Sequence, residues 1–231
     1  MKNYIITAII MIYAIPFTVA QNYYEATLNN SYKLPASKKV SMNLKFARDI
    51  KVSVGSGNEV HLKTYLKATN EEIAKMHTFD VEEGGEYLQV NTDYKLPKDE
   101  TRKRNQCWGC DTENWGGGEC LCLETRYEVL VPAGASISLE TISGDIEIKG
   151  LPNGIYAKSI SGFVDLALQS NAKADLNFKS VTGEIYTDFD NIKLDGKSTS
   201  YSKRLNAPLN GGGSRVSLET VSGDIFFRKG K

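Results

Sequence analysis

Leu139-Glu-Thr-Ile-Ser-Gly-Asp-Ile146 decides the fold of this 231-residue chain, because close copies of it follow. Each copy has a hydroxyl residue, a β-branched aliphatic, a second hydroxyl, a glycine, a mostly acidic position and an aliphatic. The other copies are Lys158-Ser-Ile-Ser-Gly-Phe-Val164, Lys179-Ser-Val-Thr-Gly-Glu-Ile185 and Leu218-Glu-Thr-Val-Ser-Gly-Asp-Ile225. Their glycines lie 18, 21 and 40 residues apart, and the last step is about two periods of ~20. Such a fixed period is typical of stacked repeat units.

Apolar and polar residues alternate on both sides of each glycine, which indicates half-buried strands. Around the second glycine, for example, the apolar positions are Ile160, Val164, Leu166 and Leu168. Because glycine tolerates positive φ, it suits the corner between two strands. The predicted corners are Gly144, Gly162, Gly183 and Gly223. We therefore predict an all-β protein whose C-terminal half is a short β-solenoid of stacked repeats of about 20 residues.

The N-terminal half predicts leading strands and a cap for this stack. Alternating stretches predict strands within Leu44–Val54, Val60–Leu66, Tyr87–Asn91 and Tyr127–Val131. The helix candidate, Asn70–His77, has at most two turns. Two stretches interrupt the strand pattern: a Cys-rich insertion over 93–122 and a polar loop or hairpin insertion over 195–214.

The first 20 residues have the pattern of a secretory signal peptide. A mostly apolar run, Tyr4 to Phe17, is followed by the small residues of Thr18-Val-Ala20 at a plausible cleavage point. The alternative is a transmembrane anchor, which needs about 20 apolar residues, but this run is shorter and contains Pro16. We expect a signal peptide over 1–20, a single domain over 21–231 and no transmembrane segment after cleavage. The protein would be exported to the periplasm, the outer surface or the medium.

The charge balance and the few histidines exclude several classes of function. Lys plus Arg and Asp plus Glu are each 28, so no net charge attracts the chain to nucleic acid, and no nucleic-acid partner is expected. A β-helix enzyme acting on polysaccharides needs acids and bases clustered at one groove. The two histidines, His61 and His77, have no partner motif. We predict no catalytic residues and no cofactor.

Three features together resemble a known family: the repeats at Leu139–Lys149 and Leu218–Arg228, the short-spaced copies between them, and Leu209-Asn-Gly-Gly-Gly. They resemble the adhesin-like β-strand-repeat proteins of bacteria, a family of unknown function related to autotransporter adhesin head-domain proteins. Ala20-Gln-Asn22 is similar to the processed start of an exported Bacteroidetes-type protein. The resemblance covers Lys39 to Lys229. It implies a β-solenoid fold and an envelope location, and it brings no catalytic residues. The Cys-rich insertion departs from it.

The four cysteines lie together in the first insertion. They are Cys107, Cys110, Cys120 and Cys122. An even cluster in an exported protein favours disulfides, and a hairpin turning near Trp115 would pair Cys110 with Cys120 and Cys107 with Cys122. The alternatives are a structural zinc site made of the four thiolates and a redox-active Cys-x-x-Cys motif. We favour the two disulfides and no metal.

The recurring polar residues of the repeats would stack in columns. The hydroxyl pairs are Thr141/Ser143, Ser159/Ser161, Ser180/Thr182 and Thr220/Ser222. A flat array of hydroxyls could bind ice or glycan, but four uneven copies favour turn chemistry and internal hydrogen bonds. The acidic positions, Asp145, Glu184 and Asp224, could form a calcium ladder. Phe163 interrupts that column and the calcium-binding nonapeptide is absent, so solvated corners are favoured.

Aromatic residues in polar stretches are the better indication of a partner, because they combine a large contact area with a polar group. Trp108, Trp115 and Tyr201 lie in or near the two insertions. We predict a non-enzymatic, adhesin-like module of the cell envelope or surface that binds an unknown protein or glycan through its inserted loops. The alternatives are a periplasmic structural or envelope-stress scaffold and a carbohydrate-active β-helix enzyme.

Overall fold

The structure is a computed structural model that describes residues 23–68, 70–83, 86–95, 123–190, 192 and 202–230. Within these ranges the chain is all-β, as predicted, apart from one short helix, α1 (Glu71–Ala74). The strands are β1 (Tyr24–Lys33), β2 (Lys39–Leu44), β3 (Asp49–Gly55), β4 (Glu59–Ala68), β5 (His77–Glu82), β6 (Tyr87–Tyr94), β7 (Leu123–Pro132), β8 (Ser136–Ser143), β9 (Asp145–Lys149), β10 (Gly154–Ser161), β11 (Val164–Leu168), β12 (Ala174–Ser180), β13 (Ile185–Thr187), β14 (Lys203–Leu209), β15 (Ser214–Ser222) and β16 (Ile225–Lys229).

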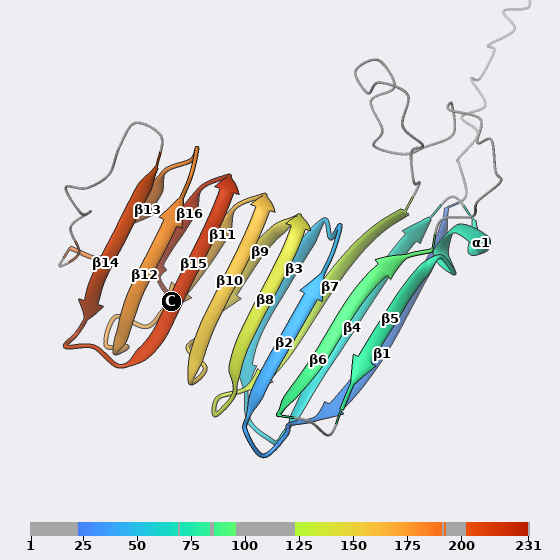
Figure 1. Cartoon of the computed structure of the whole chain (residues 1–231), viewed down its shortest axis with the longest axis horizontal. Coiled ribbons are helices and arrows are strands. Elements are labelled where there is room, and N and C mark those ends of the chain that lie inside the picture. The colour runs from blue at the N-terminus through green and yellow to red at the C-terminus, as the bar shows by residue number, and fades with distance from the viewer. Residues whose placement is uncertain are drawn as a thin grey trace, which may run out of the picture.

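The strands form two mixed sheets of eight strands each. Sheet A has the order β1-β4-β7-β3-β9-β11-β16-β13, and sheet B has the order β14-β12-β15-β10-β8-β2-β6-β5. One sheet lies over the other along the length of the molecule (Figure 1). Neither sheet closes on itself, since each ends in two edge strands within the part of the chain that the structure describes.

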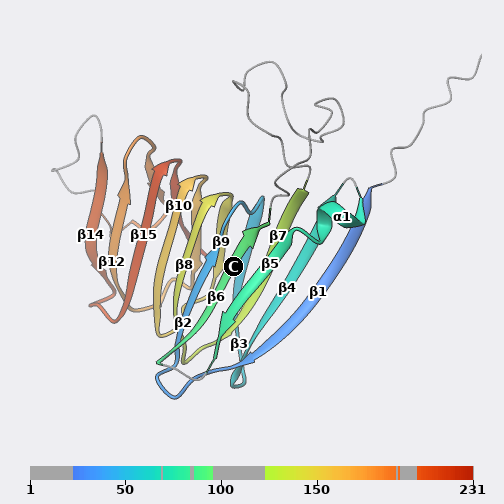
Figure 2. The ribbon, with the colours of Figure 1, turned by 45° about the vertical axis from the view of Figure 1, so that its right-hand side comes forward.

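The short helix lies at the N-terminal end of the sandwich, beside β1 and β4 (Figure 2). It forms within the stretch that the sequence predicted. The side chain of Asn70 caps it by accepting a hydrogen bond from the Ile73 amide at 2.9 Å. Ile73 is buried, as expected for the apolar position of the turn. No helix in the described ranges is long and apolar enough to span a membrane.

The chain passes from one sheet to the other at each repeat. From β8 to β13 successive strands alternate between sheet B and sheet A, and neighbouring units pair in parallel, as β10 does with β8 and β11 with β9. The β2–β3 unit joins the same stack, since β2 pairs with β8 and β3 with β9. The strand predicted in the stretch Leu44–Val54 is β3, in its second half. Leu44 ends β2, and a turn with Phe46 at φ 54° precedes β3.

The units do not stack in the order in which they occur along the chain. The fourth copy lies between the second and the third, because β15 pairs in parallel with β10 on one side and with β12 on the other. In sheet A, β16 likewise lies between β11 and β13. After β13 the chain returns through β14, an edge strand antiparallel to β12, before it forms the fourth unit. Part of the predicted insertion over 195–214 is thus a strand of sheet B.

The observed order also alternates the charges at one outward position of the units. One outward position of each unit carries Glu140, Lys158, Glu219 or Lys179, in the order of the stack. Lys158 therefore faces a glutamate on both neighbouring strands. If the units followed sequence order, Lys158 would lie opposite Lys179, and like charges directly opposite one another destabilise a sheet. The observed order replaces that repulsion with alternating charges.

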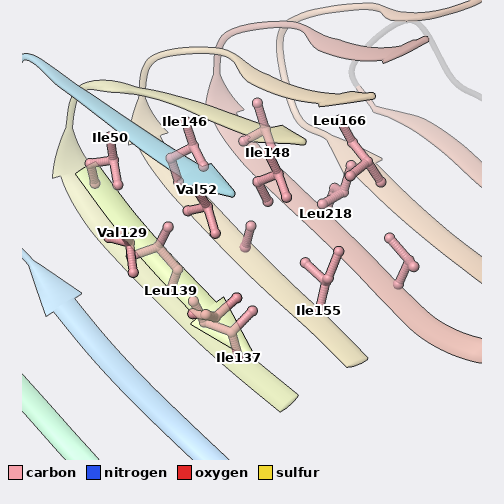
Figure 3. Packing of buried hydrophobic residues seen from close by; sticks show 14 of the residues in the cluster. Ile50, Val52, Val129, Ile137, Leu139, Ile146, Ile148, Ile155, Leu166 and Leu218 are labelled. Carbon is pink, nitrogen blue, oxygen red and sulfur yellow. The ribbon is translucent and has the colours of Figure 1, made fainter. Parts of the chain in front are cut away.

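The core lies between the sheets and is continuous from Tyr32 to Phe227. Figure 3 shows Ile146, Ile148 and Leu166 of sheet A packed against Leu139 and other aliphatic residues of sheet B. Burying each such side chain contributes about 1.5–3 kcal/mol. One predicted core residue, Ile160, is instead 43% exposed. The neighbouring Ser159 takes the inward position and is fully buried, so the alternation points Ile160 outward.

The four repeat glycines form a column at the corners of the stack, and each touches the backbone of the next unit. A Cβ atom at Gly162 would lie 2.2 Å from the carbonyl oxygen of Gly144, and one at Gly223 would lie 2.2 Å from that of Gly162. At Gly183 the corresponding distance to the Gly223 oxygen is 2.0 Å. Ala47 of the β2–β3 turn ends the column, with its oxygen 2.3 Å from a Cβ at Gly144.

The close approach of neighbouring units, rather than the backbone conformation, explains why glycine occupies most positions of this column. Gly144 has φ at +123°, as predicted for a corner. Gly162 at +158° is close to extended, and Gly183 and Gly223 lie outside the left-handed region. These positions need glycine because any side chain would collide with a carbonyl group of the neighbouring unit.

We predict that Gly162→Ala lowers the free energy of unfolding by about 2–3 kcal/mol, because the added methyl group must push two stacked units apart. Gly134→Ala is the matched control. A Cβ there would meet only the flexible end of Lys38, at 3.6 Å. Equilibrium denaturation in urea measures both variants. Equal stability of the Gly162→Ala and Gly134→Ala proteins would contradict the close contact.

Candidate functional site

The recurring hydroxyl residues of the repeats separate into an inner and an outer column. The inner residues are Thr141, Ser159, Thr220 and Ser180, and all are buried. Ser159 Oγ donates to the Gly144 carbonyl at 2.9 Å, and Thr220 Oγ1 donates to that of Gly162 at 3.0 Å. Ser180 Oγ donates to the Gly223 carbonyl at 2.9 Å. Thr141 Oγ1 donates within its own unit, to the Ser143 carbonyl at 2.7 Å. All four inner hydroxyls therefore form internal hydrogen bonds, three of them between units, and are not available to a ligand.

The acidic residue after the glycine also joins neighbouring units. Asp145 Oδ1 accepts a hydrogen bond from the amide of Phe163 at 3.1 Å, and Asp224 Oδ1 accepts one from the amide of Glu184 at 2.8 Å. These carboxylates satisfy backbone donors at the corners. Asp145 and Asp224 thus join neighbouring units, a role beyond the solvated corner positions that the sequence favoured.

Several predicted site residues lie outside the described ranges. They are Cys107, Cys110, Cys120, Cys122, Trp108, Trp115 and Tyr201, together with the signal peptide over 1–20. The two disulfides, the zinc alternative and the contact aromatics therefore stay predictions.

A groove on the outer face of sheet B brings together side chains that sequence analysis did not associate. Its lining consists of Lys39, Val40, Ser41, Tyr87, Gln89, Ser136, Ile137, Ser138, Asn153, Gly154, Ile155, Tyr156 and Arg215. These residues come from β6, β2, β8, β10 and β15 and from the turn before β10. No motif in the sequence connects them, because the strands become neighbours only through the stacking order.

The register of the strands explains the shape of the groove. One row of outward positions runs Tyr87, Lys39, Ser136, Gly154, Arg215 across five strands. The middle of this row is small: a Cβ at Gly154 would already lie 3.3 Å from the Ser136 hydroxyl. Tyr87, which is 48% exposed, borders one side. The result is a hollow with a floor of serine and glycine.

Tyr156 stands on the other side of this floor, in the neighbouring row. That row continues past Tyr156 through a second hollow formed by β15, β12 and β14. Its members are Gln89, Ser41, Ser138, Tyr156, Ser217, Asn177 and Asn206. All are uncharged side chains that can donate and accept hydrogen bonds. We call this row the polar track.

The charged side chains that line the groove are all basic. Lys39 and Arg215 are charged, and no carboxylate is among the lining residues. Lys39 Nζ lies 5.1 Å from the centre of the Tyr87 ring, a cation–π contact that positions both side chains. Burial raises the pKa of Tyr156, and the carboxylates of Glu219 and Glu140 add to this effect. The Tyr156 hydroxyl therefore stays protonated and able to donate.

The outer face of sheet A offers a contrast. A hollow over β1, β4, β7 and β3 is lined by many charges, but these charges pair with one another. Arg126 Nε lies 2.8 Å from Glu124 and 3.5 Å from Asp49, and Tyr65 donates to Glu128 at 3.0 Å. Because these groups satisfy each other, a ligand would have to displace existing ion pairs. A ligand in the groove of sheet B would not have to displace an ion pair of Lys39 or Arg215.

Neither a protein-family model nor a curated protein matches this chain. Among solved structures, a candidate cell adhesion protein from Clostridium sporogenes superimposes with a TM-score of 0.52 at 10% sequence identity, over 90% of this chain and all of that one. The two proteins therefore share a fold. A candidate adhesin from Bacteroides fragilis has a TM-score of 0.33 and 11% identity, over 88% of this chain and 97% of that one.

A buried polar pair lies at the N-terminal end of the core. His77 Nε2 is 2.7 Å from the hydroxyl of the fully buried Tyr127. The other ring nitrogen, Nδ1, is buried and has no hydrogen-bond partner among the described residues. Burial lowers the pKa of His77 to about 4, so the ring is neutral in the folded protein near neutral pH.

We predict that this histidine makes the fold sensitive to mild acid. Unfolded His77 would titrate near its ordinary value of 6.5. The stability due to the neutral ring is therefore complete above pH 6.5 and is lost as pH falls towards 4, by about 3 kcal/mol in total. Thermal unfolding followed across this range measures the loss. His77→Gln should flatten the pH dependence, whereas His61→Gln, on the outer face, should retain it. Equal profiles for the two variants would contradict the assignment.

Proposed function

We propose that the protein is a non-catalytic, adhesin-like module of the bacterial cell envelope that binds a glycan chain along the outer face of sheet B. The observation that carries this proposal is the groove between Tyr87 and Tyr156, continued by the polar track. Sugars present hydroxyl groups around apolar C–H faces. Tyrosine rings suit those faces, and serine, asparagine and glutamine side chains suit the hydroxyls.

The form of the track also favours a chain-like ligand. Its residues lie on seven neighbouring strands, and strands in a sheet are about 4.8 Å apart. The track therefore offers one polar side chain at each step across the sheet. Asn177 and Asn206 already bond to each other at 2.8 Å, which fixes both amides at the far end. A flexible polymer that runs across the strands would meet a repeated set of partners.

The residues of the groove support a binding role without catalysis. Hydrolysis or elimination on a polysaccharide requires a positioned acid and base. The lining holds no carboxylate and no histidine, and its one lysine, Lys39, lies against the Tyr87 ring. We therefore propose that the groove binds a saccharide and leaves it unchanged.

The remaining parts of the proposal come from the sequence. The fold shared with a candidate cell adhesion protein supports membership of the adhesin-like β-strand-repeat family. We propose a solenoid-like coil of the four repeats within one domain over 21–231, export directed by residues 1–20, and disulfides at Cys110–Cys120 and Cys107–Cys122. The insertions over 93–122 and 195–214 would add contacts to a partner at the cell surface.

Replacing the groove tyrosines tests the proposal. We expect Tyr87→Ala and Tyr156→Ala each to weaken binding to a glycan selected on an array by about tenfold, because each removes an aromatic contact at the centre of the site. Isothermal titration calorimetry with the selected oligosaccharide measures the change.

Tyr186→Ala provides the control. Tyr186 is also exposed, at 50%, but it lies on sheet A, where its ring stacks on Phe226 at 5.3 Å. This variant should bind as the unaltered protein does. Loss of binding in Tyr186→Ala with full binding in both groove variants would move the site to sheet A and contradict the proposal.

A further inference from the structure

We infer that the ligand of the sheet B groove is an acidic glycan whose carboxylate groups are bound by Lys39 and Arg215. This inference rests on the proposed function and specifies its ligand. The charge of the lining is the first argument: it contains two cations and no carboxylate. A chain of neutral sugars would supply neither cation with a carboxylate, whereas a polyuronate would supply one for each.

The state of these two cations is the second argument. Some basic residues of the described surface form ion pairs, such as Arg126 with Glu124 and Lys45 with Asp93. Neither Lys39 nor Arg215 has a carboxylate within 4.0 Å in the described part of the chain. The guanidinium group is planar and matches a carboxylate through two parallel hydrogen bonds. Arg215 is therefore suited to hold an acid group of the ligand.

The positions of the cations set the spacing of the acid groups. Lys39 on β2 and Arg215 on β15 lie in the same row, with β8 and β10 between them. Three inter-strand steps of about 4.8 Å place their backbones about 14 Å apart. Between them, Ser136 and Gly154 leave room for an uncharged part of the chain. Arg215 also lines the second hollow, but Asp175 lines it too, so only an uncharged part of the chain would continue over β12 and β14.

Charges on the other side of Tyr156 alternate in sign and offer an acidic chain a less uniform surface. The outward positions two residues further along the strands carry Glu140, Lys158, Glu219, Lys179 and Arg204. Glu140 and Glu219 flank Lys158 and repel an acidic chain. In the row of Lys39 and Arg215 the first carboxylate is that of Asp175, the register partner of Arg215 on β12, so the acid groups of the ligand are placed between β2 and β15.

Charge removal tests this inference. The probes are a galacturonic-acid oligosaccharide and its methyl ester, which have the same sugar backbone but differ in charge. We expect the unaltered protein to prefer the acid form, and we expect Lys39→Gln and Arg215→Gln each to weaken its binding by about tenfold. Arg215→Lys should give an intermediate loss, since it keeps the charge but not the two parallel hydrogen bonds. Raising the salt concentration should reduce the preference.

Lys158→Gln is the matched control, because Lys158 lies on the same face of β10 but outside the groove lining. The affinity of this variant for the acid form should remain within twofold of that of the unaltered protein. Equal binding of acid and ester, lost in Tyr87→Ala but unchanged in Arg215→Gln, would overturn the inference and leave the proposed function standing. Absence of any glycan binding would overturn both. Binding of polyglutamate as tightly as the oligosaccharide, with the same dependence on Lys39 and Arg215, would overturn the assignment to a glycan.

Discussion

The contact between each corner glycine and the carbonyl group of the next unit is the constraint on which the structure depends. The Cα of Gly162 lies so close to Gly144, and that of Gly223 so close to Gly162, that a methyl group would not fit. Buried hydroxyls such as Ser159 and Thr220 bind the same carbonyl groups and hold the column together. Because the corners touch, the strands on both sides of each corner pair in parallel and in register, and the inward aliphatic residues form one continuous core.

The same register arranges the outer surface. When units stack without a shift, equivalent outward positions form straight rows across the sheet. On sheet B one row has small residues at its centre, with Tyr87 and Lys39 on one side and Arg215 on the other. On sheet A the corresponding rows carry charges that pair across strands, as Arg126 on β7 does with Asp49 on β3. The two faces share one backbone arrangement but differ in their side chains, and for this reason we propose sheet B as the binding face.

The sequence predicted the strands within each repeat unit well, but it did not predict which units lie next to each other in the stack. Alternation around the glycines predicted strands, an all-β class and buried residues such as Ile146 and Leu218, because burial follows the period of two directly. The stacking order was not evident, since the four copies have equivalent contact residues and any pair could be neighbours on apolar packing alone. The alternation of Lys158, Glu219 and Lys179 across neighbouring strands is compatible with the observed order, but it becomes visible only once the order is known. The groove could not be foreseen, because Tyr87 and Arg215 become neighbours only after the order is known.

The central claim is that the fourth repeat lies between the second and the third. Zero-length carbodiimide cross-linking of the native protein, followed by peptide mass spectrometry, tests it directly. In the structure Glu219 is the register partner of both Lys158 and Lys179. We predict that both cross-links form. In a stack that follows sequence order, Glu219 would adjoin Lys179 but not Lys158. A Lys179–Glu219 link without any Lys158–Glu219 link would contradict the account.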